Sequence, residues 1–219
     1  MENVEQDNTI NAPSKSTLVA DVTHFYSSDF KDMFFTFFKN PISGILTIFQ
    51  NPSDKSYTHA LILYASVAIL YLVGTFLLAG DMRDYMNLSA YLKITLFPVL
   101  TMLAISVLSF AVKSIAGKIN LKDELLTGAL CGIPLGLLIP GLLVSKVLGS
   151  DNVLSLLMNP SSGSILFILL FLYVFLMLVN VFQQSLKSAK ANDTLAWYVS
   201  PLCIALAVYL ASKISENLF

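Results

Sequence analysis

Few side chains in this sequence have the types and spacing that enzyme chemistry requires. Neither histidine, His24 or His59, stands at metal-ligand spacing from a cysteine or a carboxylate. Serines inside the apolar runs, such as Ser106 and Ser109, have no histidine to serve as their base. The sequence also lacks the HExxH, CxxC, GxSxG and GxGxxG motifs. We therefore expect a protein that is not an enzyme and that holds no metal and no cofactor.

Small residues with regular spacing occur instead, inside the apolar run TGALCGIPLGLLIPG (Thr127–Gly141). Gly128, Gly132 and Gly136 are four residues apart, so on a helix they lie along one face. In lipid, burying leucine against leucine gains little, and a face of small residues lets another helix approach closely. The spacing predicts a face for packing within a helical bundle, for self-association or for a membrane partner.

Helix-breaking and polar residues inside the apolar runs are the other candidates. Pro134 and Pro140 each remove a backbone donor and kink a helix, so the freed carbonyls need partners in neighbouring helices or in water. Asn180 is strongly polar and either hydrogen-bonds across helices or contacts a substrate. These three residues are candidates for a helix break or for the lining of a cavity.

The elements that must position these residues are membrane spans. Of the 219 residues, 56% are hydrophobic and 12% are charged, against about 25% charged in an average soluble domain. A span needs roughly 20 apolar residues. Five runs qualify, at Thr58–Ala79, Lys93–Ile115, Leu125–Leu148, Ile165–Phe182 and Leu195–Ile214. We expect an all-α, polytopic membrane protein with five transmembrane helices in residues 58–214. The net charge of −1 gives no basic footprint for nucleic acid.

The residues before the first span divide into two parts. Residues 1–28 begin with a polar, acidic stretch and are expected to form a disordered cytoplasmic tail. In residues 29–51, aromatic and aliphatic side chains recur at three- and four-residue steps, which is typical of amphipathic helices. Asp29 is expected to cap the first helix, and Asn40 followed by Pro41 to begin a second. These helices either lie in the membrane interface or pack against the bundle.

The distribution of lysine and arginine predicts the orientation of the spans. Of these residues, eight that lie near the spans are on the side that holds the N-terminus and the second and fourth connections, against four on the other side. Because cytoplasmic loops are enriched in lysine and arginine, the N-terminus is expected in the cytoplasm.

The third run and its approach, SIAGKINLKDELLTGALCGIPLGLLIPGLL, resemble the corresponding region of the Yip family of Ypt/Rab-interacting membrane proteins, in its bacterial branch. The resemblance is carried by a short loop containing glycine and lysine, a patch of small residues and two prolines. FFKNPISGILTIF is similar to the proline-containing helix before the first span of bacterial members. The matching residues are Gly117, Lys118, Glu124, Leu125, Gly132, Pro134 and Pro140.

The resemblance implies a five-helix bundle that acts through partners. Eukaryotic members of the family are linked to prenylated Rab GTPases and to vesicle trafficking. Their acidic, tyrosine-containing N-terminal motif has no match in this tail, so we expect a bacterial inner-membrane protein instead.

Two functions from different classes are compatible with these observations. The first is a non-enzymatic adaptor or organiser of membrane proteins or lipids, whose partners are the bilayer and a membrane protein or a second copy of the chain. The alternative is a permease for a small molecule or an ion that uses the proline-broken third span with Asn180.

Overall fold

Five long helices form the body of the protein. A computed structural model describes residues 15–51, 56–80, 86–115, 121–147 and 162–218, and no strand occurs among these residues. The spans are α4 (Ser56–Ala79), α5 (Leu88–Ser114), α6 (Leu121–Gly136) with α7 (Leu138–Val147), α9 (Ser162–Ser188) and α10 (Asp193–Leu218). The predicted all-α fold with five spans is confirmed.

The length and the surface of these helices fit a bilayer. A helix of 24 to 27 residues is about 36–40 Å long, enough to cross a hydrocarbon core of about 30 Å. Mean hydropathy over the spans runs from 1.7 to 2.9. Large apolar side chains such as Ile69, Leu169 and Leu202 are more than half exposed on the outer faces. The chain is therefore a multi-pass membrane protein.

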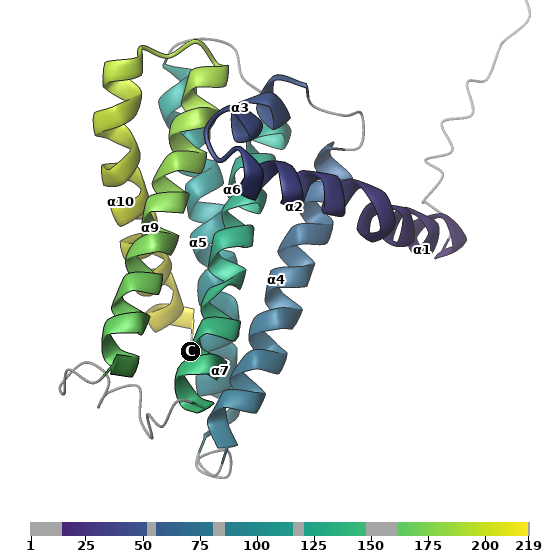
Figure 1. The fold of residues 1–219 in the computed structure, drawn as a ribbon, viewed down its shortest axis with the longest axis vertical. Helices are drawn as coiled ribbons and strands as arrows, with labels where there is room; N and C mark the ends of the chain where they lie inside the picture. Colours follow the sequence, from purple (N-terminus) through teal and green to yellow (C-terminus); the bar gives the residue numbers. More distant parts are fainter. Residues whose placement is uncertain (1–14, 52–55, 81–85, 116–120, 148–161, 219) are drawn as a thin grey trace, which may run out of the picture.

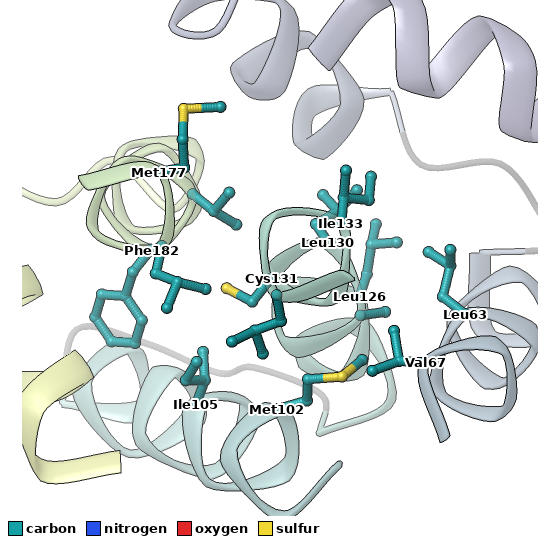
Figure 2. Close-up of a cluster of buried hydrophobic side chains, with 14 of the residues drawn as sticks. Leu63, Val67, Met102, Ile105, Leu126, Leu130, Cys131, Ile133, Met177 and Phe182 are labelled. Carbon is teal, nitrogen blue, oxygen red and sulfur yellow. The ribbon is translucent and has the colours of Figure 1, made fainter. Parts of the chain in front are cut away.

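The third span lies at the centre of the bundle. In its apolar segment 56% of the residues are buried, against 28% in α4 and in α9. Figure 2 shows why: Leu130 and Cys131 of α6 lie between Val67 of α4, Met102 of α5 and Phe182 of α9. Residues positioned on α6 therefore meet three other spans.

The third span is interrupted at Leu137, between α6 and α7. Pro140 has no backbone N–H to donate to the Gly136 carbonyl, so the helical ladder is broken at this point. The Leu137 amide bonds the Pro134 carbonyl at 3.1 Å. From α4, the Tyr71 hydroxyl donates to the Leu135 carbonyl at 2.8 Å. A neighbouring helix thus satisfies a carbonyl at the break, as backbone in lipid requires.

Four short helical segments precede the first span. They are α1 (Lys15–His24), the π-helical turn η1 (Phe25–Asp29), α2 (Phe30–Lys39) and α3 (Ser43–Gln50). The first three form one continuous rod that crosses an end of the bundle and extends past α4 (Figure 1). We call α1, η1, α2 and α3 together the N-terminal platform. The C-terminus lies at the opposite end of the bundle (Figure 1).

The platform corrects three expectations. The predicted cap at Asp29 is wrong, because this residue has helical backbone angles and makes no capping bond. Helix also occupies residues 15–28 of the expected disordered tail, since Phe25 is fully buried and anchors the rod. The second helix begins at Ser43 rather than after Asn40, although the Asn40 carbonyl accepts from the Gly44 amide at 2.8 Å. Residues 1–14 lie outside the described residues.

Candidate functional site

The face formed by Gly128, Gly132 and Gly136 lies inside the bundle, against α4 and α5. A Cβ atom at Gly128 would collide with the Met102 carbonyl, with Ser106 and with Tyr64. At Gly132 it would come within 2.7 Å of Met102 Cε and 2.8 Å of Val67 Cγ2. At Gly136 the nearest atom would be Leu70 Cδ2, at 3.3 Å. Helix α6 therefore packs more closely against its neighbours at Gly128 than at Gly136.

Polar contacts accompany the closest approach. The Tyr64 hydroxyl of α4 lies 3.0 Å from Ser106 Oγ of α5, and both groups are buried. Ser106 Oγ also accepts a bond of 3.2 Å from the Gly128 amide of α6. Three spans thus meet at one hydroxyl, which is within reach of the α6 backbone only because residue 128 has no side chain.

A buried ion pair lies one turn beyond Gly128. Lys113 Nζ of α5 is 2.8 Å from both carboxylate oxygens of Glu124 on α6. The two side chains are only 6% and 5% exposed. A charge in the apolar interior is costly unless it is paired and hydrogen-bonded, so this pair needs every contact around it.

Three hydroxyl groups complete the surroundings of the pair. Ser109 Oγ donates to Glu124 Oε2 at 2.5 Å, and Lys113 Nζ donates to Ser185 Oγ of α9 at 2.7 Å. Thr127 Oγ1 lies 2.6 Å from Ser185 Oγ and 3.3 Å from Glu124 Oε2. We call Ser109, Lys113, Glu124, Thr127 and Ser185 the charge network. It joins α5, α6 and α9 at the end of the bundle where the platform lies.

The charge network was missed by the sequence analysis, which named Glu124 only as a residue of the family resemblance and did not single out Lys113. Helix α6 already begins at Leu121, so Glu124 falls on its first turns and points into the bundle. The spacing of these residues in the sequence could have indicated the network. Glu124 is four residues before Gly128 and thus shares the glycine face, as Ser109 and Lys113 share one face of α5.

The platform lies directly over the charge network. The Phe49 ring of α3 lies 5.9 Å from Lys113 Nζ, which is within range of a cation–π interaction. Helix α3 also packs against α9. The Phe49 ring therefore covers the buried Lys113 ammonium on the side that faces α3.

Asn180 fixes the platform to the bundle. Its side-chain amide donates to the carbonyl of Pro41, in the turn between α2 and α3. Its Oδ1 accepts from Gln184 Nε2 at 3.1 Å, which orients the amide. The structure thus brings Asn180 to the platform turn rather than to Pro134 or Pro140. Pro134 is buried inside α6, and Pro140 is exposed on the surface of α7.

Metal-binding chemistry has no evident place among the described residues. No group of three histidine, cysteine, aspartate or glutamate side chains in the ranges that the structure describes could hold a metal ion. Cys131 and Cys203 are both free thiols and buried. Gly117 and Lys118, which carry part of the family resemblance, lie outside the described residues.

Comparison of the chain with models of protein families, with curated proteins and with solved structures finds no match.

Proposed function

We propose that the chain is a non-enzymatic organiser of membrane partners or lipids, of the Yip type, with the N-terminal platform as its working surface and the five spans as a rigid base. The observation that carries this proposal is the attachment of an amphipathic rod across one end of the bundle. The rod has its own ties to the spans and keeps an outward apolar surface.

Three contacts, two from η1 and one from the turn between α2 and α3, hold the platform in place. Tyr26 of η1 hydrogen-bonds Ser66 of α4. Asp29 Oδ2 lies 3.2 Å from His59 Nε2 of α4. The turn between α2 and α3 is held by Asn180 of α9, as described above. Ties to two separate spans favour a fixed platform over a loosely tethered helix.

The exposed side chains of the platform include large apolar groups and charged groups of both signs, among them Asp32. Val19, Phe35 and Ile42 are 68%, 61% and 64% exposed. Lys31 and Lys39 are exposed on the same helix as Phe35. Exposed apolar side chains beside lysines are typical of helices that lie in the headgroup region of a membrane or that bind a partner there. With the N-terminus in the cytoplasm, as the lysine distribution predicts, the platform would face the cytoplasmic leaflet.

The interior of the bundle supports the organiser more than the permease. The glycine face is filled by Met102 and Val67, and the charge network is closed by its own hydrogen bonds. A permease would use the break at Leu137 as part of a substrate path, yet Tyr71 occupies the Leu135 carbonyl there. The family resemblance and the bacterial inner membrane remain part of the proposal on the strength of the sequence alone.

Photocrosslinking in native membranes tests the working surface. A photoreactive residue at Phe35 is compared with one at Tyr209, an exposed position on α10. We expect defined protein or lipid adducts at position 35 that are absent at position 209, and their loss when Ile42 is changed to aspartate. Identical adduct patterns at the two positions would contradict the proposal.

A further inference from the structure

The first part of the platform extends beyond the spans. Helix α1 and the turn η1, residues 15–29, continue the rod past α4, and we call them the arm. Figure 1 shows α1 beyond α4, clear of the five spans. Among the described elements, α1 packs chiefly against η1. The side chains of α1 therefore meet whatever surrounds the bundle at this level.

One face of the arm is apolar. Val19, Val22 and Tyr26 are three and four residues apart, so they share a face of the helix. These side chains are 68%, 40% and 44% exposed. The neighbouring Phe25 is fully buried and packs beside His59 of α4 with ring centroids 4.9 Å apart, which fixes the rotation of the arm. The arm thus presents an apolar stripe, Val19, Val22 and Tyr26, that the described elements leave largely exposed.

The apolar stripe points along α4 toward the middle of the bundle. Asp29 contacts His59 near the start of α4, whereas Tyr26 hydrogen-bonds Ser66. The step from residue 59 to residue 66 corresponds to about 10 Å of helix. The face of α4 that carries Ser66 continues with Ile69, which is 62% exposed on the outer surface of the span. The apolar stripe is therefore continuous with a surface of α4 that faces the acyl chains of the bilayer.

The charge of the arm excludes attraction to anionic headgroups as the force that holds it. Residues 19–30 contain no lysine or arginine but two carboxylates, Asp21 and Asp29. Exposed hydroxyl side chains, those of Thr23 and Ser27, are among the polar groups of this segment. A helix that binds a membrane through apolar side chains, with few charges on its polar face, responds to the packing and the curvature of the lipids.

We propose that the arm lies in one leaflet beside α4, with the apolar stripe among the acyl chains, and that it directs the protein to membranes whose lipids are loosely packed in that leaflet. Lipids are packed in this way where the leaflet is convex, because the headgroups are spread apart there. The inference rests on the proposed function for the placement of the platform at the membrane surface, and it names the acyl region of the bilayer as the partner of the arm.

Electron paramagnetic resonance of the full-length protein in liposomes tests the position of the arm. A nitroxide is attached at Val19→Cys and, in a matched sample, at Lys31→Cys, an exposed position on the same rod. The native thiols of Cys131 and Cys203 are buried, and unmutated protein treated with the same reagent is their control. We expect oxygen, which concentrates among acyl chains, to relax the label at position 19, and a water-soluble nickel chelate to relax the label at position 31. Relaxation of both labels by the chelate overturns the inference.

Membrane tubes pulled from giant vesicles test the lipid preference. A dye that does not cross the bilayer labels the N-terminus only in molecules whose platform faces outward. We expect the unmutated protein to be enriched in the tube, where the outer leaflet is convex, over the flat membrane. The double variant Val19→Ser with Val22→Ser should lose this enrichment, and Thr23→Ser, an exposed position on the same helix, should keep it. Equal enrichment of the double variant and the unmutated protein would overturn the lipid preference.

The outcomes separate this inference from the proposed function. A label at position 19 that lies in water, while position 35 still crosslinks to a defined partner, overturns the inference alone. A label at position 19 among the acyl chains, with identical adducts at positions 35 and 209, supports the inference and overturns the proposed function. Dipolar coupling between the position-19 labels of two molecules, with protection from both oxygen and the chelate, overturns the lipid as partner and assigns the apolar stripe to a second copy of the chain.

Discussion

The glycine face and the charge network occupy successive turns of the same helix, yet they hold the spans together by opposite means. At Gly128 and Gly132 the spans meet because side chains are absent, and the polar contacts there join only uncharged groups. At Glu124 the spans meet around a full charge that is held by Lys113 and by two hydroxyls, those of Ser109 and Thr127. Helix α6 therefore combines a face that excludes any added side chain at Gly128 with a contact that depends on the pairing of two full charges.

The strongest way to break the comparison is to remove one member of the ion pair. Glu124→Ala leaves the Lys113 ammonium buried without its counter-charge, and we expect the free energy of unfolding to fall by about 3–5 kcal/mol. Unfolding in mixed micelles by a denaturing detergent measures this loss. Lys187→Ala is the control, because the contact of Lys187 with Asp193 is more exposed and is worth at most about 1 kcal/mol.

The double variant Lys113→Met with Glu124→Leu sharpens the same point. Both charges disappear together and the volume is largely kept, so most of the stability lost in Glu124→Ala should return. The measurement is the same detergent titration. A double variant as unstable as the single one would mean that the hydroxyls, not the charges, set the stability of the network.

A larger side chain is expected to disrupt the packing of the glycine face. Gly128→Leu places a side chain against the Met102 backbone carbonyl, which cannot move aside as a flexible side chain does. We expect a loss of about 3 kcal/mol, visible as a lower yield of monodisperse protein and a lower thermal midpoint. A fully stable Gly128→Leu protein would show that α5 and α6 are farther apart than described.

A smaller effect is expected where the platform meets the bundle. Asn180→Leu removes the donor to the Pro41 carbonyl, and an interhelical hydrogen bond in a membrane protein is worth about 0.6–2 kcal/mol. We expect faster amide hydrogen exchange in α3 with little change in α5 and α6. Exchange that rises equally in all helices would contradict a local role for Asn180.

The smallest effect is expected at the loose end of the glycine face. Gly136→Ala meets only Leu70 Cδ2, the end of a flexible side chain. The free energy of unfolding should change by no more than about 0.5 kcal/mol, and the thermal midpoint measures it. A loss of stability as large as that of Gly128→Leu would contradict the decrease in packing closeness from Gly128 to Gly136.

The sequence predicts the spans well because each needs only a local property, about 20 apolar residues in a row. The four-residue spacing of the glycines likewise follows from helix geometry. The charge network was missed because Glu124 stands just before the apolar run and was assigned to the connection by composition. Extending the four-residue spacing one step back from Gly128 reaches Glu124, so this part of the site was accessible from the sequence.

Other contacts could not be derived in this way. Asn180 and Pro41 are 139 residues apart, and His59 reaches Asp29 only because the rod crosses the start of α4. Such pairs depend on how whole helices pack, which no local pattern encodes. The continuous helix through η1 was also missed, because its anchor, the burial of Phe25, is a tertiary contact.

The interruption at Leu137 has a consequence for how the protein fits membranes of different thickness. A straight span answers a thinner or thicker bilayer by tilting as a whole. A span made of α6 and α7 changes its effective length when the angle between the two segments changes, and only α7 has to move. The mismatch of this one span is then absorbed at the far end of the bundle, where α7 packs against α4 and α9, while Glu124 at the start of α6 keeps its place in the charge network.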